Sequence, residues 1–512
     1  MDRRPNVDIV PAVSGRPGGS TRADPCALVV FGATGDLGRR EVLPALFELF
    51  SGGLLPERWA LLAVARQSWN DDRFRSFARE GVAEHCRADR RRWDEFARRL
   101  TFHSMDAGER GAFDGLRPVL NALDTEHGLG GNALFHLAVP PRIFEPIVGG
   151  LEAAGLTRSE AGWRRLLVEK PFGTDRASAA RLNARLLEAF DEHDLYRIDH
   201  FLGKESVQNM LVFRFANPGF EAIWNRDHIE QVQITVAEDI GIGSRAAFYE
   251  STGVVRDMVQ NHLLQLLSLV AMEPPVSLTA DALRDETVKV LDAVALRGLT
   301  VRDDAVLGQY GEGVVDGERV PAYRDEPDVS PQSTTATYAA VELGVRNWRW
   351  AGVPFYLRTG KRLGRKLTQV VLQFRPVPAI PNLGSADETR RHWLAFRLQP
   401  DEGITRVFSA KRPGPDLELT DVAMDFTYAR SFGLTDPPRA YAWLFLDAMQ
   451  GDPMLFARAD WVDRAWAIVD PLVAAAAEAG APRLYPAGAW GPAAADSLLE
   501  RSGHHWIAAD VR

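Results

Sequence analysis

Short, continuous runs of apolar residues mark the first 200 residues of the chain. Such runs are typical of strands buried on both faces of a parallel sheet. Between them, apolar positions recur at helical spacing, so strands and helices should alternate. This pattern predicts an α/β Rossmann-like N-terminal domain. The runs that predict strands are residues 26–31, 60–65, 133–139 and 165–169.

The later part of the chain has a different pattern, in which apolar and polar residues alternate. Alternation of this kind indicates a half-solvated, mainly antiparallel sheet. It is found in residues 229–236, in much of 335–345 and in 367–374, and helical spacing returns at 440–449 and 462–477. We therefore predict a flexible tail over residues 1–24, a dinucleotide-binding domain over 25–200 and a larger α+β domain over 201–512.

The composition is that of a globular protein and excludes several classes. The 512 residues carry 60 basic and 69 acidic side chains, and the formal net charge of −9 argues against bulk binding to nucleic acid or anionic membrane. No apolar run approaches the ~18 residues of a spanning helix. Two cysteines alone build neither a disulfide framework nor a metal cage. We expect a cytoplasmic protein that binds no nucleic acid and no membrane.

Three glycines, Gly32, Gly35 and Gly38, lie between the first predicted strand and a helix. Small residues at such a turn let the backbone approach a pyrophosphate, and the helix N-terminus offers free N–H groups and partial positive charge. A glycine pattern alone is weak, but its position in a βαβ unit indicates a dinucleotide site. A tight turn without a ligand is the alternative.

The end of the second predicted strand indicates which dinucleotide is bound. NAD sites usually have an acidic residue there for the ribose 2′-hydroxyl, whereas NADP sites have a cation for the 2′-phosphate. This strand ends in Arg66, while Asp71 and Asp72 are typical of the start of the next helix. The pattern favours NADP, with NAD as a secondary acceptor and a lone surface arginine as the alternative.

Residues 196–205 read as a strand end that leads into a new helix. On a strand, Asp199 and His200 would project to opposite faces, so that one serves a partner while the other meets a ligand. Lys204 would stand at the start of a helix over residues 205–213. A helix N-terminus with a lysine and a nearby histidine predicts a site for a phosphate monoester.

Residues 254–265 predict a helix that is buried nearly all round. Asp257 and Asn261 would share a face, with His262 about a third of a turn away. Three polar groups in a buried helix favour a cleft, although a core histidine is favoured for His262 taken alone. A neutral histidine is a suitable base when a carboxylate orients its other nitrogen, and the pattern does not say which aspartate does so.

Longer motifs make the interpretation specific. From about residue 26 to the C-terminus, the chain resembles the glucose-6-phosphate dehydrogenase family. The motifs that carry the resemblance are residues 31–38, 169–173, 197–205, 256–265, 347–361 and 485–492. The resemblance implies oxidation of glucose 6-phosphate at C1 to 6-phospho-D-glucono-1,5-lactone with hydride transfer to NADP, the first step of the oxidative pentose phosphate pathway.

The resemblance also implies roles for single residues. His262 matches the general base and Asp199 the carboxylate that orients it, with no metal. The implied substrate ligands are His200, Lys204, Glu238, Asp257, Lys361, Lys366 and Lys170. The implied cofactor ligands are Gly32, Thr34, Gly35, Asp36, Leu37, Arg66, Asp106, Lys170 and Pro171. A homodimer or homotetramer assembled through the large sheet is implied as well.

The chain departs from the family pattern at a few positions. Phe201 stands where the family usually has tyrosine, and losing a hydroxyl that contacts a phosphate costs about 1.5 to 3 kcal/mol if nothing replaces it. Glu41 stands where a basic residue is more usual. Phe201 leaves open the same chemistry on another hexose phosphate or on a free hexose. A non-catalytic NADP-binding regulator is the alternative from another class, although the predicted base and phosphate ligands are present.

Overall fold

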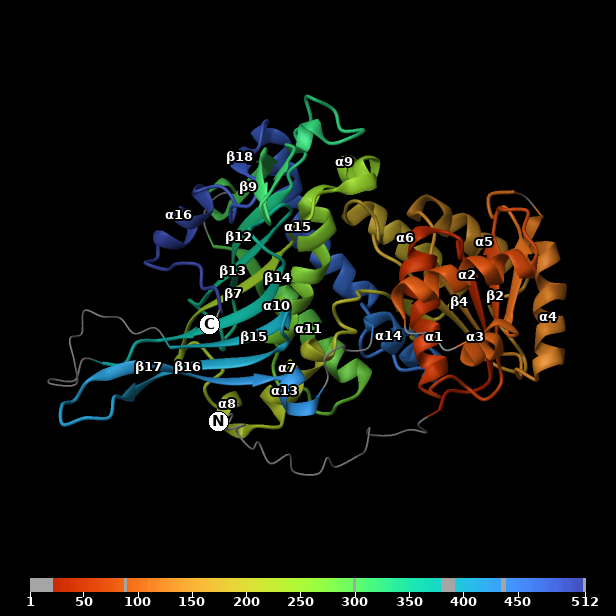
Figure 1. The fold of residues 1–512 in the computed structure, drawn as a ribbon, viewed down its shortest axis with the longest axis horizontal. Coiled ribbons are helices and arrows are strands. Elements are labelled where there is room, and N and C mark those ends of the chain that lie inside the picture. The colour runs from red at the N-terminus through yellow and green to blue at the C-terminus, as the bar shows by residue number, and fades with distance from the viewer. Residues whose placement is uncertain are drawn as a thin grey trace.

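A six-stranded parallel sheet forms the N-terminal domain (Figure 1). The computed structural model describes residues 22–86, 90–109, 111–297, 301–378, 392–433 and 439–509, so the predicted tail lies almost wholly outside the described residues. The strand order is β3-β2-β1-β4-β5-β6. The strands are β1 (Cys26–Phe31), β2 (Trp59–Ala65), β3 (Leu100–Ser104), β4 (Ala133–Leu137), β5 (Arg164–Val168) and β6 (Leu195–Arg197). The four apolar runs are confirmed as strands. Edge strand β3 is half-exposed and therefore has no continuous apolar run.

Helices connect these parallel strands and bury their apolar stripes against the sheet. Asp71 and Asp72 lie in the first turn of α2, as the sequence predicts, and the Asn70 side chain caps the helix. The helical segments are η1 (Gly38–Val42), α1 (Leu43–Ser51), α2 (Asp71–His85), α3 (Arg90–Ala97), η2 (Ala112–Gly115), α4 (Leu116–His127), η3 (Pro141–Ile143), α5 (Phe144–Ala153), α6 (Arg176–Ala189) and η4 (Glu192–Asp194).

The larger domain is built on a ten-stranded, mainly antiparallel sheet, which confirms the predicted fold class. Its order is β17-β16-β15-β14-β7-β13-β12-β9-β18, with β8 paired to β12, and only the pairs β7–β13 and β9–β18 are parallel. Its strands are β7 (Ile229–Ala237), β8 (Val294–Leu296), β9 (Ala305–Gly311), β12 (Tyr338–Val345), β13 (Pro354–Gly360), β14 (Leu367–Phe374), β15 (Trp393–Gln399), β16 (Gly403–Lys411), β17 (Leu419–Thr427) and β18 (Arg483–Pro486). A hairpin of β10 (Gly313–Val315) and β11 (Glu318–Val320) is separate.

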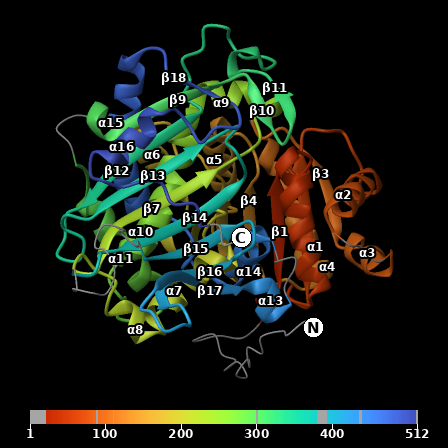
Figure 2. The ribbon, with the colours of Figure 1, turned by 60° about the vertical axis from the view of Figure 1, so that its left-hand side comes forward.

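Helices of the larger domain lie between its sheet and the N-terminal domain, as the two views show (Figures 1 and 2). The segment η6 packs on β7 and β13 and on α15, so it lies at the centre of the molecule. The helical segments are α7 (Glu205–Phe215), α8 (Pro218–Glu221), η5 (Gly243–Arg245), α9 (Ala246–Val254), η6 (Val255–Leu263), α10 (Leu264–Ala271), α11 (Ala280–Ala293), α12 (Val301–Asp304), η7 (Tyr323–Asp325), α13 (Tyr428–Phe432), α14 (Ala440–Gln450), α15 (Ala459–Ala479) and α16 (Ala494–Glu500).

Buried glutamines hold the C-terminal segment against the large sheet. The Gln233 amide donates to the carbonyl of His505 at 2.7 Å and accepts from the Ile507 N–H at 2.9 Å. Gln369 makes the same pair of contacts with Ile507 and Ala509. The glutamine side chains thus form the backbone hydrogen bonds that a neighbouring strand would otherwise form with this segment. This role explains why these polar side chains are buried.

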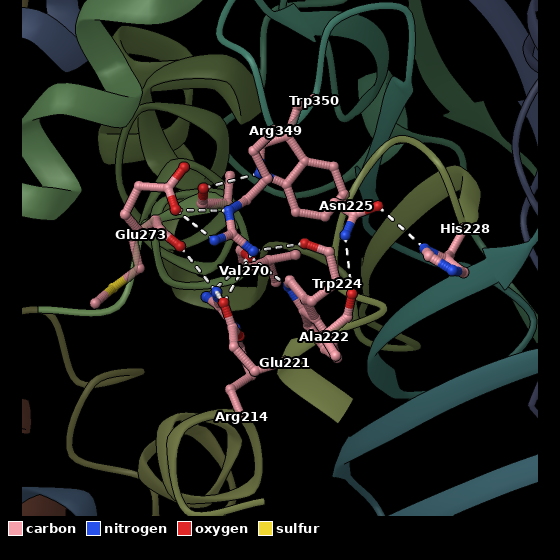
Figure 3. Close-up of polar contacts among 12 residues, drawn as sticks. Arg214, Glu221, Ala222, Trp224, Asn225, His228, Val270, Glu273, Arg349 and Trp350 are labelled. Carbon is pink, nitrogen blue, oxygen red and sulfur yellow. Dashed lines mark hydrogen bonds and ion pairs between the residues drawn. The ribbon is translucent and has the colours of Figure 1, made fainter. Parts of the chain in front are cut away.

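Arg214 joins α7 to the end of α10 in a buried polar network (Figure 3). Its guanidinium is fully buried and donates to the carbonyls of Leu269, Val270 and Met272. These carbonyls lie at a helix C-terminus, where they lack intrahelical donors and favour a cation. Glu221 lies 3.2 Å from Arg214 and supplies the opposite charge.

Arg349 completes this network from the loop before β13. It lies 2.9 Å from Glu221, pairs with Glu273 and donates to the Trp224 carbonyl at 2.8 Å. Each guanidinium therefore has a carboxylate partner. Because α7 begins beside Lys204 and α10 follows η6, the network fixes the two segments that carry the predicted phosphate and base residues.

Replacing Arg214 by methionine should reduce the free energy of unfolding by about 3 kcal/mol, because a buried pair is broken and three helix-terminal carbonyls lose their donor. Urea unfolding followed by tryptophan fluorescence measures the change. Lys289→Met removes an exposed pair with Glu286 and should change stability by about 0.5 kcal/mol or less. Equal losses in the two variants would contradict the role of the network.

Candidate active site

The glycine turn follows β1 at the carboxyl edge of the parallel sheet. Gly32 has φ +78°, and a Cβ there would lie 2.3 Å from the carbonyl oxygen of Ala138. A Cβ on Gly38 would lie 2.3 Å from the carbonyl oxygen of Ala33. Both glycines are therefore required by close backbone packing. Gly35 is exposed between them and presents its backbone to solvent. The turn leaves the space that a pyrophosphate needs at the start of the helix.

Arg66 and Asp106 follow β2 and β3, at the same edge of the sheet as this turn. Arg66 is exposed, and among the described residues its side chain has no hydrogen-bond or ion-pair partner. Thr34 donates to Gln67 at 2.9 Å and so ties the glycine turn to the end of β2. Asp106 is exposed and accepts from the N–H of Gly108. The edge therefore offers an exposed cation on the side of the glycine turn.

The other predicted cofactor residues differ in exposure. Asp36 is exposed and lies 3.8 Å from Arg40, and Leu37 packs partly on the core. Pro171 lines the cavity described next and follows a cis peptide bond. Glu41, the unusual acidic residue after the turn, lies 3.2 Å from Arg439 at the start of α14. That contact gives Glu41 a structural partner in this chain.

A cavity of about 430 Å³ opens where the two domains meet, at the carboxyl ends of β5 and β6. All the predicted substrate residues line it, and so does His262; Asp199 lies directly behind His262. The lining includes His200, Lys204, Glu238, Asp257, Lys361, Lys366 and Lys170. The structure thus brings together residues that are up to two hundred positions apart in the sequence.

His262 is buried and is held at both ring nitrogens. Its Nδ1 lies 2.5 Å from Oδ1 of Asp199, and its Nε2 lies 2.8 Å from Nζ of Lys170. A lysine ammonium only donates, so Nε2 is the acceptor and Nδ1 carries the proton that is donated to Asp199. The imidazole is therefore neutral, with its lone pair directed toward the cavity.

Two aromatic rings enclose the same imidazole. Phe201 stacks on His262 with ring centroids 4.1 Å apart and an interplanar angle of 21°. His200 meets the ring edge-on at 4.6 Å. The Phe201 ring therefore supports the plane of the imidazole, a contact that the sequence did not reveal. It also carries the ammonium of Lys204 at 4.7 Å from its centroid.

The helix around His262 differs from the prediction. Residues 255–263 form a π-helix rather than an α-helix, so residues five apart are brought together. Asp257 and His262 both contact Lys170 as a result, at 3.2 Å and 2.8 Å. The prediction of an α-helix with His262 a third of a turn away is wrong, because π-helical spacing brings His262 toward the face that Asp257 and Asn261 share, and all three line one cavity. π-Helical turns are frequent at functional sites.

The strand end before α7 also differs. β6 ends at Arg197, so Asp199 and His200 lie in the following turn and do not alternate across a strand. Both side chains reach His262, Asp199 through a hydrogen bond and His200 through its ring. The prediction of a strand at these two residues is therefore wrong, because β6 ends two residues before Asp199.

The charges of the cavity keep the base neutral. Burial and the adjacent ammonium of Lys170 hold the pKa of His262 well below its usual range. Burial opposes the ionisation of Asp257, but the charges of Lys170 and Lys361 outweigh it and hold the pKa of Asp257 at about 2. The cavity is therefore cationic on balance around a neutral imidazole, which suits an anionic ligand.

The lysines of the cavity have partners that a ligand can replace. Lys361 is buried and lies 2.5 Å from Glu238. Lys204, the N-cap residue of α7, donates to Gln399 at 2.7 Å. Lys366 is exposed at the cavity wall. Gln399 was missed from the sequence, because a single glutamine at a strand end carries no recognisable signal.

The glycine turn and the cavity both lie at the carboxyl edge of the parallel sheet. In open α/β sheets, ligands bind at this edge. Fold and site together define an NAD(P)-dependent oxidoreductase.

Comparison with known proteins specifies the family. Residues 29–209 match the family model of the glucose-6-phosphate dehydrogenase NAD-binding domain, and residues 211–507 match that of the C-terminal domain. The chain belongs to the glucose-6-phosphate dehydrogenase family. It is 45% identical over 488 residues to glucose-6-phosphate 1-dehydrogenase of Aggregatibacter actinomycetemcomitans, covering 95% of this chain and 98% of the relative. It is also 45% identical to glucose-6-phosphate 1-dehydrogenase 2 of Mycobacterium bovis, covering 94% and 95%.

Solved structures agree with this assignment. A glucose-6-phosphate dehydrogenase in complex with glucose 6-phosphate matches with a TM-score of 0.87 at 33% identity, covering 96% of this chain and all of the other. The enzyme from Mycobacterium avium matches with a TM-score of 0.83 at 36% identity and the same coverage. Within the described part of the chain, none of the helices combines the length and apolarity needed to cross a bilayer.

Anion binding in the cavity should depend on Lys204. Burial lowers the pKa of Lys204 to about 8, so the free protein loses this positive charge as the pH rises through about 8. The affinity for inorganic phosphate should then weaken by up to about 10-fold per pH unit above that value. Calorimetric titration between pH 7.5 and 9.5 measures it. Lys204→Arg, which stays charged, should show a flat profile, and a flat profile in the unmodified protein would contradict the prediction.

Proposed function

We propose that the chain oxidises the C1 hydroxyl of glucose 6-phosphate to 6-phospho-D-glucono-1,5-lactone with NADP as the preferred hydride acceptor. Membership of the family at this identity gives the chain glucose-6-phosphate 1-dehydrogenase activity, an oxidoreductase reaction of the pentose phosphate pathway. The observation that carries the residue assignment is His262, a buried neutral imidazole that is oriented by Asp199 and faces a cationic cavity.

In this proposal, His262 is the general base. The C1 hydroxyl of the sugar displaces Lys170 from Nε2, and Nε2 accepts the hydroxyl proton as the C1–O bond becomes a carbonyl. Asp199 holds the Nδ1 proton and stabilises the imidazolium that forms. NADP, when bound, supplies the nicotinamide carbon that accepts the hydride from C1. Proton and hydride both leave the substrate, so the product is the neutral lactone group.

The remaining cavity residues are proposed to bind the sugar. His200, Lys204 and Lys366 provide the cationic and N–H groups for the phosphate. Glu238 and Asp257 accept from sugar hydroxyls, and the lysines that now pair with them, Lys361 and Lys170, then donate to the substrate. This exchange of partners keeps the charges of these two pairs hydrogen-bonded with and without the sugar. Phe201 supplies a stacking surface rather than a phosphate ligand.

NADP is favoured by the edge of the parallel sheet. Gly32, Thr34, Gly35, Asp36 and Leu37 are proposed to wrap the pyrophosphate, with Asp106 and Pro171 at the sides. The free guanidinium of Arg66 suits a 2′-phosphate. Asp71 is the carboxylate nearest to Arg66 in the sequence, and it accepts a hydrogen bond from the N–H of Phe102 at 2.7 Å. We also propose a homodimer or homotetramer in the cytoplasm, with NAD as a secondary acceptor.

The test is an absorbance assay for the reduced cofactor with glucose 6-phosphate and NADP, beside parallel reactions with NAD, with other hexose phosphates and with free glucose. Efficient reduction only with the phosphorylated sugar and NADP supports the proposal. Comparable reduction with free glucose would favour the alternative that the chain oxidises unphosphorylated hexoses, which the presence of Phe201 left open. Absence of reduction in every reaction would favour a non-catalytic regulator.

His262→Asn should lower kcat by at least about 100-fold, because the general base is removed, and should leave the affinity for glucose 6-phosphate nearly unchanged. Steady-state kinetics with calorimetric binding measures both quantities. His127→Asn, at the end of α4, is the control and should retain full activity. A kcat that barely changes in His262→Asn would identify this residue as structural.

Arg66→Ala should raise the KM for NADP by about 10- to 100-fold and leave the KM for NAD nearly unchanged, because only NADP carries the 2′-phosphate. Initial rates at varied cofactor concentration measure the two constants. The control is Arg79→Ala, which removes an exposed arginine of α2 and should change neither constant. An equal effect of Arg66→Ala on both cofactors would contradict the assignment.

A further inference from the structure

Glu169 is a buried carboxylate that the proposed mechanism does not use. It lies between the end of β5 and Lys170. Its Oε1 is 3.0 Å from Nε2 of His136 on β4, and its Oε2 accepts from the Tyr441 hydroxyl of α14 at 3.0 Å. A buried carboxylate is expensive unless each oxygen is hydrogen-bonded, and both oxygens are. We refer to Glu169, His136 and Tyr441 as the Glu169 cluster.

The helix that contributes Tyr441 comes from the last quarter of the chain but packs on the N-terminal domain beside α1 (Figure 1). Phe445, one turn after Tyr441, meets the His136 ring edge-on at 5.2 Å. Arg439, the N-cap residue of α14, lies 3.2 Å from Glu41 and 3.1 Å from Glu48. α14 is therefore fixed at one end to the helix after the glycine turn and in its middle to Glu169.

We propose that the Glu169 cluster positions Lys170, so that its ammonium lies between His262 and Asp257 at the place where the sugar hydroxyl and the nicotinamide must meet. This inference rests on the proposed function. Lys170 has a long, flexible side chain, and the position of its backbone decides where the ammonium can reach. Glu169 is its direct neighbour, and the cluster anchors that neighbour to two elements, β4 and α14.

The consequence is electrostatic and can be measured at His262. The charged or titratable groups around this imidazole are Lys170 after β5, Asp199 and His200 after β6, Lys204 at the start of α7 and Asp257 on η6; the pair of Glu238 after β7 and Lys361 after β13 lies further along the cavity. Lys170 is the cation in direct contact with Nε2. When this ammonium moves away, the pKa of His262 rises. The imidazole is then already protonated, and unable to act as a base, at a pH at which it is still neutral in the unmodified chain.

The experiment compares Tyr441→Phe, which removes one hydrogen bond of the cluster, with Lys170→Met and with Tyr356→Phe. Tyr356 is another buried tyrosine, and its hydroxyl lies 3.1 Å from His504, so Tyr356→Phe is the control. Tyr441→Phe should lower kcat/KM by about 10-fold. It should also shift the acid limb of the pH profile of kcat/KM upward, in the same direction as Lys170→Met. Tyr356→Phe should do neither at a similar loss of melting temperature.

A second readout does not require turnover. In protein labelled with ¹⁵N-histidine, the resonance that is absent in His262→Asn reports protonation of His262 in the free protein. It should titrate at higher pH in Tyr441→Phe and in Lys170→Met than in the unmodified chain, and Glu169→Ala, if it folds, should show a larger shift than Tyr441→Phe. An unchanged titration and an unchanged kcat/KM in Tyr441→Phe, with only a lower melting temperature, would overturn the proposal. If the unmodified protein reduces no cofactor, the proposed function fails, and the titration alone then decides the role of the cluster.

Discussion

The hydrogen bond between Asp199 and His262 is the contact on which the rest of the site depends. Its two partners come from different domains, one from the turn after the last parallel strand and the other from the π-helix that packs on the large sheet. Burial of both groups excludes water, so the bond fixes the imidazole tautomer and plane. Every other cavity group is placed relative to this pair, and the cavity exists because the domains are held in register around it.

Polar clusters away from the cavity hold the larger domain together and join it to the N-terminal domain. Arg214 and Arg349 tie the start of the larger domain to the end of α10 (Figure 3), and Arg439 ties α14 to the helix after the glycine turn. Guanidinium groups suit this purpose because one planar group satisfies a carboxylate and several helix-terminal carbonyls at once. The geometry of the cavity thus depends on these polar clusters as well as on the apolar core.

Two pairs of opposite charge line the cavity. Lys170 lies 3.2 Å from Asp257 and Lys361 lies 2.5 Å from Glu238, so these four charges offset one another within a cavity that is cationic on balance. Phe201 fits this arrangement, because its ring supports His262 on one side and the Lys204 ammonium on another without introducing a further polar group. The departure from the usual tyrosine thus has a packing partner in this chain.

Much of the architecture followed from the sequence alone. The apolar runs predicted the parallel sheet, the alternating segments predicted the antiparallel one, and Gly32 and Gly38 predicted a turn that only glycine fits, because these patterns report which face of a local element is buried. Longer motifs indicated the family. Only the tertiary structure decided that Asp257 and His262 share Lys170, that Gln399 meets Lys204 and that Tyr441 reaches Glu169. These contacts join distant segments or depend on a π-helical turn, and neither sequence periodicity nor residue type encodes how two domains pack against each other.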